Sequence, residues 1–329
     1  MRVEFHESGI FLPEIELWLD STEPRNTAWI SHAHGDHAGG LHGRVFGTAA
    51  TLELYRMRLT ETPDCCPVWF GEPWEHRGAR LTAYPAAHIV GAAQLLVEYR
   101  GERLLYTGDI KLKTPICGWE TETVTCDRLI VESTFGLPIY RFVDAGAARE
   151  RIAAFARECL DEGLTPVFIG YPLGRGQEIV HVLCNTGIAA SVHGSIARFI
   201  PVYEQNGYEF PGWEPYDAKT TAGKALVMVP GFQKYIEASG KAYRLAYVSG
   251  WALLDNARAR VGAEELIPYS DHADFDELLT IVERSGAREV DVVHGYTEMF
   301  AYVLSQTGID ARAPRESGLR AMSGDTPEG

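Results

Sequence analysis

The sequence lacks long apolar runs. None of its 329 residues lies in a stretch of eighteen consecutive apolar residues, whereas a membrane-spanning helix needs about 20. Residues 1–10 lack the apolar stretch of a secretory signal. The six cysteines form no C-x-x-C pair and no spacing typical of a disulfide framework. These absences predict a cytoplasmic protein with reduced thiols and no membrane partner.

Positively charged residues are also scarce. Lys and Arg number 30 against 45 Asp and Glu, so the formal net charge is −15. This balance counts against a broad nonspecific surface for nucleic acid. It leaves room for a local site, because bound divalent cations would dominate the electric field there.

The densest group of potential metal ligands is His32, His34, Asp36 and His37, directly after an apolar run at residues 27–30 that predicts a buried strand. Imidazole and carboxylate groups suit zinc and similar divalent ions. Alternate residues of an extended segment can direct His32 and His34 at one ion, which leaves Asp36 and His37 for a second ion. A solvated, histidine-rich loop without metal is the less favoured alternative, because the rest of the chain supplies further ligands.

The pattern of the whole chain predicts an α/β fold with a change of texture near residue 144. Before that point the sequence predicts mainly strands, and residues 60–80 read as an irregular surface insertion. After it, strands and helices alternate, which indicates a parallel sheet covered by helices. Asp144 is expected to cap a helix whose apolar stripe is Ala148, Ile152, Phe155 and Cys159. A further helix is expected over residues 195–205.

Ligand-type residues stand where several predicted strands give way to loops: His32, Asp109, Glu132, His272 and His294. Sites gather at such strand ends because the sheet holds the converging loops rigidly. A lone His88 would usually be an ordinary residue. Joined to His32 and His34, it completes a three-imidazole site with one open position, the arrangement of a catalytic ion, and Asp109 can bridge to a second ion.

These residues also carry a family resemblance. The segment from His32 to His37, His88 within residues 86–94, and Asp109 after Tyr-Thr-Gly resemble successive motifs of the metallo-β-lactamase fold. The later part of the chain resembles the β-CASP branch of nucleic-acid-cleaving enzymes. Its motifs A, B and C match Glu132 in Glu-Ser-Thr-Phe-Gly, His272 in Ser-Asp-His-Ala-Asp and His294 in Val-His-Gly. Residues 173–178 and the Ser-Asp-His-Ala-Asp motif further resemble short bacterial exonucleases associated with DNA ligase and helicase genes.

The resemblance implies an αββα metallo-β-lactamase sandwich with an inserted β-CASP α/β cap domain. The sandwich would comprise residues 1–136 and 265–314, and the cap residues 137–264, with a cleft for a nucleic-acid strand between them. Residues 315–329 are expected to form a disordered tail.

The family also implies a role for each matched residue. His32, His34 and His88 would hold one divalent ion, and Asp36, His37, Asp109 and His294 a second ion, with Asp109 bridging. Zinc is the favoured metal and manganese the alternative. Three residues are expected to be catalytic: Asp36, His272 as the general acid, and Glu132, which would orient His272 and raise its pKa.

Three residues are weaker candidates for contacts with substrate phosphates. Arg175 and Gly176 open a helix after a strand, where backbone amides and a guanidinium suit an anion. A plain strand-to-helix turn explains them about as well. Ser195 begins the next helix and could do similar work, although an ordinary N-cap is the favoured interpretation.

The sequence therefore predicts a two-metal nuclease, favoured as a DNA exonuclease that acts on single-stranded ends in DNA repair and is functionally associated with ligase and helicase. A β-CASP ribonuclease is the nearest alternative, because a histidine in motif C is linked with RNA cleavage in eukaryotic members. A small-molecule metallohydrolase would not need the insertion, Glu132 or His272. A nonenzymatic scaffold would be expected to have lost ligands, and none is missing here.

Overall fold

The computed structural model describes residues 1–232, 236 and 242–314. The tail expected at residues 315–329 lies outside this range. Within the described residues, no helix combines the length and the apolar character needed to cross a membrane.

The first sheet is mixed. Its strands, in order across the sheet, are β1 (Glu4–His6), β2 (Gly9–Leu12), β3 (Leu17–Leu19), β4 (Thr27–Trp29), β5 (Arg44–Thr48) and β6 (Asp64–Val68). The three strands from β1 to β3 are antiparallel neighbours, and those from β3 to β6 are parallel. The short turn η1 (Pro13–Ile15) connects β2 to β3. β4, predicted from its apolar run, leads directly to the loop that carries His32.

The second sheet faces the first. Across it run β19 (Asp310–Arg312), β18 (Glu289–Gly295), β11 (Arg128–Ser133), β10 (Glu102–Tyr106), β9 (Ala93–Tyr99), β8 (Ala79–Pro85) and β7 (Pro73–His76). Successive residues of a strand point to opposite faces. Leu95 and Val97 of β9 accordingly pack with Leu17 and Trp29 of the first sheet, whereas Leu96 packs on the outer face. Both faces of this sheet are therefore buried.

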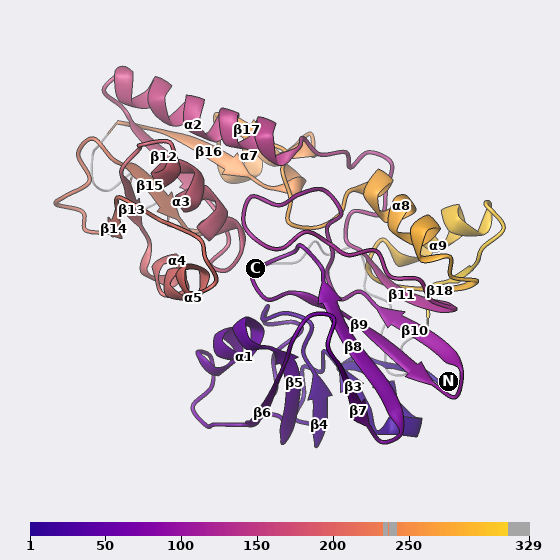
Figure 1. Cartoon of the computed structure of the whole chain (residues 1–329). Helices are drawn as coiled ribbons and strands as arrows, with labels where there is room; N and C mark the ends of the chain where they lie inside the picture. Colours follow the sequence, from indigo (N-terminus) through magenta and orange to yellow (C-terminus); the bar gives the residue numbers. More distant parts are fainter. Residues whose placement is uncertain (233–235, 237–241, 315–329) are drawn as a thin grey trace.

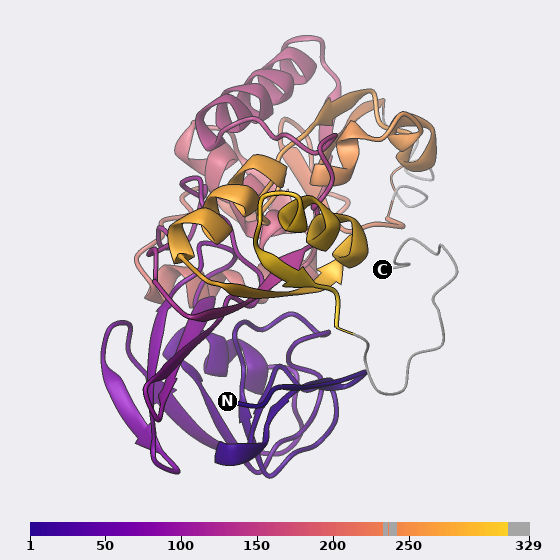
Figure 2. The ribbon, with the colours of Figure 1, turned by 90° about the vertical axis from the view of Figure 1, so that its right-hand side faces the viewer.

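Helices cover the outer faces of the two sheets. On the first sheet, α1 (Ala49–Arg56) packs against Ile30 and Val45. On the second, α8 (Phe275–Ser285) and α9 (Thr297–Ser305) lie beside β11 and β18 (Figures 1 and 2). The layers follow the order helix, sheet, sheet, helix, which confirms the predicted αββα sandwich, called the core below.

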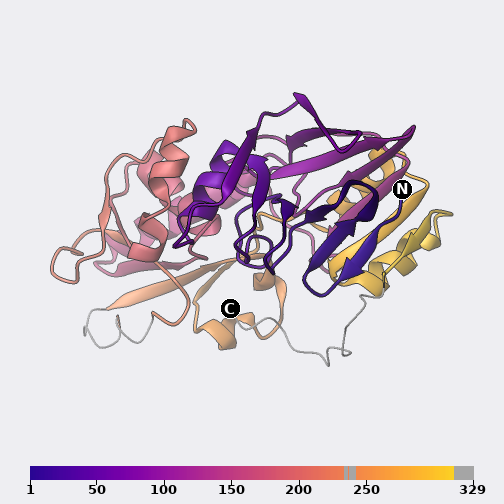
Figure 3. The same cartoon turned by 90° about the horizontal axis from the view of Figure 1, so that it is seen from below.

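A third sheet forms the inserted cap. Its strands are all parallel: β14 (Trp213–Pro215), β13 (Ala190–Val192), β15 (Ala225–Met228), β12 (Thr165–Ile169), β16 (Tyr243–Val248) and β17 (Glu265–Ile267). Among the described residues, the helical elements of the cap are α2 (Ala145–Asp161), α3 (Arg175–Asn185), α4 (Gly194–Ala197), α5 (Ile200–Gln205), η2 (Gly250–Leu253) and α7 (Ala257–Val261). Figures 1 and 3 show this cap beside the core. The domain boundary at residue 264 stays a prediction, although β17 pairs within the third sheet.

Helix α2 follows its prediction closely. Asp144 caps it by accepting a hydrogen bond from the amide of Ala147, and the predicted apolar stripe is buried. The stripe packs against the cap sheet in a cluster that includes Phe168. A spacing of three and four residues therefore identified the buried face of this helix correctly.

Three local predictions are wrong. Residues 60–80 contain β6 and β7 rather than an irregular insertion, because pairing with β5 and β8 overrides the weak strand propensity of their prolines. The helix expected over residues 195–205 is broken into α4 and α5, with Pro201 in the first turn of α5. Ser195 does not cap α4; the side chain of His193 accepts the hydrogen bond from its amide.

Candidate metal centre

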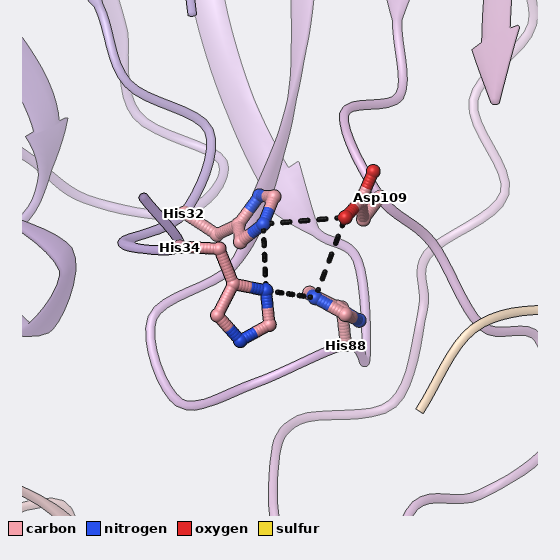
Figure 4. Close-up of side chains that lie close together, drawn as sticks. All are labelled: His32, His34, His88 and Asp109. Atoms are coloured by element: carbon pink, nitrogen blue, oxygen red, sulfur yellow. Dashed lines mark hydrogen bonds and ion pairs between the residues drawn. The ribbon is translucent and has the colours of Figure 1, made fainter. Parts of the chain in front are cut away.

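Four of the predicted ligands converge on loops that follow strands of both core sheets. His32 and His34 come from the loop after β4, His88 from the loop after β8, and Asp109 from the loop after β10 (Figure 4). Gly108 permits this approach: its φ is +56°, and a Cβ there would lie only 2.5 Å from Ser31 Oγ.

The ligand atoms of these four residues face one another. His34 Nδ1 lies 3.1 Å from His32 Nε2 and 3.0 Å from His88 Nε2. Asp109 Oδ2 lies 3.3 Å from His32 Nε2 and 3.6 Å from His88 Nε2. All four atoms lie within 4.8 Å of one another. Nitrogen and oxygen donors gathered in this way form the expected coordination sphere of a divalent ion.

The opposite ring nitrogens have partners of their own. His34 Nε2 lies 3.1 Å from the Leu173 carbonyl, and His88 Nδ1 lies 3.0 Å from the Asp271 carbonyl. Because a carbonyl only accepts, each of these nitrogens donates, and the other nitrogen of each ring keeps its lone pair for a metal. Two carbonyls thus fix the tautomers that metal binding requires.

The charge states of this group also suit a metal. Burial lowers the pKa of His34, and burial together with the nearby His272 lowers the pKa of His88 to about 3. Burial alone would raise the pKa of Asp109, but the imidazoles of His37 and His32 hold it well below its usual range. Neutral imidazoles beside an ionised carboxylate are the forms that bind metal ions.

The second predicted set is looser. His37 Nε2 lies 3.4 Å from Asp109 Oδ1 and 3.9 Å from Asp36 Oδ2. The ring of His294 lies 5.1 Å from the ring of His37, centroid to centroid. Asp36 is largely exposed, with 79% of its side chain accessible, so it stands at the rim of the group. The structure thus places His37 beside the other oxygen of Asp109, with Asp36 and His294 on the far side of contacts to His37.

Asp20, at the end of β3, is a site residue that sequence reasoning missed. Its buried carboxylate lies 2.8 Å from His37 Nδ1 and accepts a 2.7 Å hydrogen bond from the Tyr106 hydroxyl. It also accepts from the backbone amide and hydroxyl of Ser31. It therefore turns His37 Nε2 towards Asp109 and tethers the start of the ligand loop. A single acidic residue among unrelated neighbours carries no signal in the sequence.

His272 and Glu132 form a separate pair beside the first group. His272 Nδ1 lies 2.9 and 3.0 Å from the two carboxylate oxygens of Glu132, which is fully buried and also accepts from the amide of Ile110. Nε2 of His272 lies 3.9 Å from Asp109 Oδ2. Burial would lower the pKa of His272, but Glu132 and Asp109 raise it to about 10. Glu132 and Asp109 therefore favour the protonated form of an imidazole that borders the metal ligands.

Comparison with known proteins shows similarity along nearly the whole chain. A protein of Opitutus terrae named Probable DNA ligase is 33% identical over 313 residues, which cover 93% of this chain and 30% of that protein. Cleavage and polyadenylation specificity factor subunit 3 of Dictyostelium discoideum is 30% identical over 216 residues, or 54% of this chain and 26% of that protein. The chain belongs to the β-CASP metallo-β-lactamase family. No family model matches it.

Other comparisons agree with this placement in the β-CASP family. The RNase J-like protein of Methanocaldococcus jannaschii is 24% identical over 197 residues, covering 53% of this chain and 46% of that protein. A crystal structure of an Enterococcus faecalis V583 protein of unknown function shares the fold, with a TM-score of 0.57 at 15% identity over 81% of this chain and 74% of that chain. The chain spans less than half the length of these curated relatives. Its ligands and relatives place it among the metal-dependent enzymes of the family.

The residues of this β-CASP chain fit two divalent ions. The first group supplies three neutral imidazoles and a shared carboxylate, and the second supplies His37 and the other oxygen of Asp109. The rings of His34 and His88 donate to backbone carbonyls and that of His37 to Asp20, which leaves the other ring nitrogen of each free for a metal ion. A carboxylate placed between two sets of ligands is the arrangement of a bridged two-metal site.

The three weaker candidates for phosphate contacts already have protein partners. Arg175 is buried and forms ion pairs with Glu178 and Asp271. The amide of Gly176 donates to the carbonyl of Tyr171, and the amide of Ser195 donates to the His193 ring. Their role in phosphate binding stays a prediction.

Proposed function

We propose that the protein is a two-metal phosphodiesterase that hydrolyses nucleic acid. The His272–Glu132 pair carries this proposal, because a buried carboxylate holds a protonated imidazole beside the metal ligands. A hydrolase of small thioesters or lactams would not need such a group. A phosphodiester does need one, because its leaving sugar oxygen must gain a proton.

The residues divide the chemistry between them. The two divalent ions, with zinc favoured over manganese, would supply Lewis acidity and activate water when bound to the two ligand sets. His272 donates the proton on Nε2 to the departing oxygen. Glu132 keeps His272 charged and oriented through Nδ1, and Asp36 completes the second ligand set at its exposed rim.

Single-stranded DNA is the favoured substrate, cleaved from its ends during DNA repair in the cytoplasm. This choice rests on the likeness to a protein named Probable DNA ligase along 93% of the chain, together with the motifs that resemble ligase-associated exonucleases. The association would couple the nuclease to ligase and helicase partners.

RNA cleavage is the second candidate function. Two matched relatives are named RNase J-like protein and Endoribonuclease YSH1, and motif C is His294, which stands beside His37. Digestion of end-labelled single strands of one sequence, as DNA and as RNA, separates the two functions. Cleavage from DNA ends supports the proposal. Exclusive cleavage of RNA would transfer the assignment to a ribonuclease, and cleavage of neither strand would refute the nuclease.

A further inference from the structure

Two arginines lie beside the metal-ligand loop at residues 32–37. Arg58 follows α1, and its Nη1 lies 3.3 Å from the position that a Cβ on Gly35 would take. Arg198 follows α4 in the cap, and its Nη2 donates a 2.6 Å hydrogen bond to the carbonyl of Met57. Arg58 of the core thus lies beside the metal-ligand loop, and Arg198 of the cap contacts the residue that precedes Arg58.

Within the described residues, neither arginine of this pair forms an ion pair with a carboxylate. In the part of the chain that the structure describes, Arg58 makes no side-chain hydrogen bond or ion pair. Arg198 binds the Met57 carbonyl and lies 4.8 Å from the Phe199 ring. Partial desolvation by the surrounding protein lowers the pKa of Arg58, Asp36 raises it, and Arg198 lowers it. Both residues are exposed, although the chain as a whole is acidic.

We propose that Arg58 and Arg198 bind a backbone phosphate of the substrate strand, next to the phosphate that is cleaved. Guanidinium groups match phosphate oxygens with paired, charge-assisted hydrogen bonds. An anion between the two side chains would relieve their mutual repulsion. This inference rests on the proposed nuclease function and names the contact that would hold the strand across the boundary between core and cap.

Neutral methylphosphonates, placed one at a time along a labelled single strand, test this contact. The wild-type kcat/KM should fall roughly 10- to 100-fold at one position near the cleaved bond. Arg58→Gln and Arg198→Gln should lose similar activity on the unmodified strand and become insensitive to that position. Arg100→Gln, in the turn between β9 and β10, removes the same charge elsewhere and should behave as wild type.

The outcomes separate this inference from the proposed function. If the wild-type protein cleaves the strand and both variants keep its kcat/KM, the proposed arginine site is wrong and the proposed nuclease function is unaffected. If the kcat/KM of the variants is lower by the same factor for every methylphosphonate position, the arginines act only through their general charge. That result would also contradict the site. Failure of the wild-type protein to cleave any strand would remove both proposals.

A different observation concerns the cap loop at residues 173–175, which contacts the first metal group. The Leu173 carbonyl binds His34, as described above. Gly174 has a φ of +95°, and a Cβ there would lie 2.7 Å from Ile89 Cγ2 and 3.0 Å from Asp271 Oδ2. Only glycine therefore lets the cap loop lie this close to the core.

Arg175, the next residue, connects the same loop to Asp271, which contacts His88. Arg175, only 2% exposed, lies over the Tyr269 ring at 4.5 Å, and its Nη2 lies 3.0 Å from Asp271 Oδ1. The backbone carbonyl of Asp271 in turn accepts from His88. We infer that Arg175 and Asp271 are positioning residues that fix His34 and His88 as ligands. Partners behind the ligands commonly determine metal affinity in this way.

Metal affinity tests this second inference without any nucleic acid. Asp271→Asn keeps the backbone carbonyl and removes one of the two carboxylate charges that hold Arg175, the other being Glu178. Competition with a chromophoric chelator should show the first zinc ion bound about 10- to 100-fold more weakly. Arg175→Lys should give a smaller loss, because the positive charge is kept without the planar fork.

Asp291→Asn is the matched control. Asp291 is a fully buried aspartate paired with Arg128 and Arg312, both at 2.7 Å, whereas Asp271 is 14% exposed and paired with Arg175. This variant should bind metal as wild type does. If folded Asp271→Asn binds zinc as tightly as the wild-type protein, the positioning role is wrong. If Asp291→Asn loses as much zinc affinity as Asp271→Asn, the loss reflects general destabilisation.

Discussion

His272 contacts Glu132, whereas the ring of His294 lies beside His37, so the two histidines are expected to do different work. His272→Ala should fold normally and keep both ions, with a rate lower by roughly 10²–10⁴, the usual contribution of a positioned proton donor. The loss should shrink on a nitrophenyl phosphodiester, whose leaving group needs no proton. Metal analysis and kinetics on both substrates measure this.

His294→Ala supplies the comparison. It should weaken the second ion and therefore lose activity on both substrates alike. Loss of metal from His272→Ala, together with full metal retention in His294→Ala, would reverse the roles given to these residues.

Glu132→Gln tests the charge behind His272. Glu132 raises the pKa of His272, so the acid form persists to higher pH and activity declines only as the pH rises through that pKa. The neutral amide removes this support, so the alkaline limb of the kcat profile should move to lower pH. The rate at low pH should fall less than in His272→Ala. An alkaline limb at the wild-type position would show that Glu132 does not control this proton.

At the scale of elements, Asp20 at the end of β3 orients the ligand loop that follows β4. Asp20→Asn keeps the size of the side chain but removes the charge facing His37 Nδ1 and disrupts the bonds to Ser31 and Tyr106. The second ion should bind about 10- to 100-fold more weakly, and the first ion should be less affected. Stepwise chelator titration measures both affinities. Equal weakening of the two ions would assign Asp20 to the whole loop rather than to His37.

The sequence indicates elements whose signals are local. The apolar run before His32 and the stripe of α2 are short-range patterns, and both elements form as predicted. β6 and β7 depend on pairing with neighbouring strands, so their prolines conceal them. Asp20 accepts a hydrogen bond from Tyr106, 86 residues away, and Arg198 of the cap donates one to the Met57 carbonyl of the core. Such contacts leave no periodicity or spacing in a single sequence.

At the scale of the whole molecule, the metal ligands connect the layers of the fold. They come from loops of both sheets, and one of them is held by the cap through Leu173. Bound ions would therefore stabilise the packing of the sheets and the cap as a unit. The first ligand group is incomplete in either sheet alone, because its histidine loop follows β4 whereas His88 and Asp109 follow β8 and β10.

The purified protein should accordingly carry close to two divalent ions per chain, and chelation should lower its Tm. An ion present at 1,000 times its Kd adds about 4 kcal/mol to the free energy of unfolding, so removal of both ions should lower Tm by roughly 10 °C. Elemental analysis and calorimetry with and without EDTA measure the two quantities. The His32→Ala/His34→Ala double variant should bind fewer ions and respond less to EDTA. If that variant keeps both ions and the full Tm response, these two histidines are not the ligands.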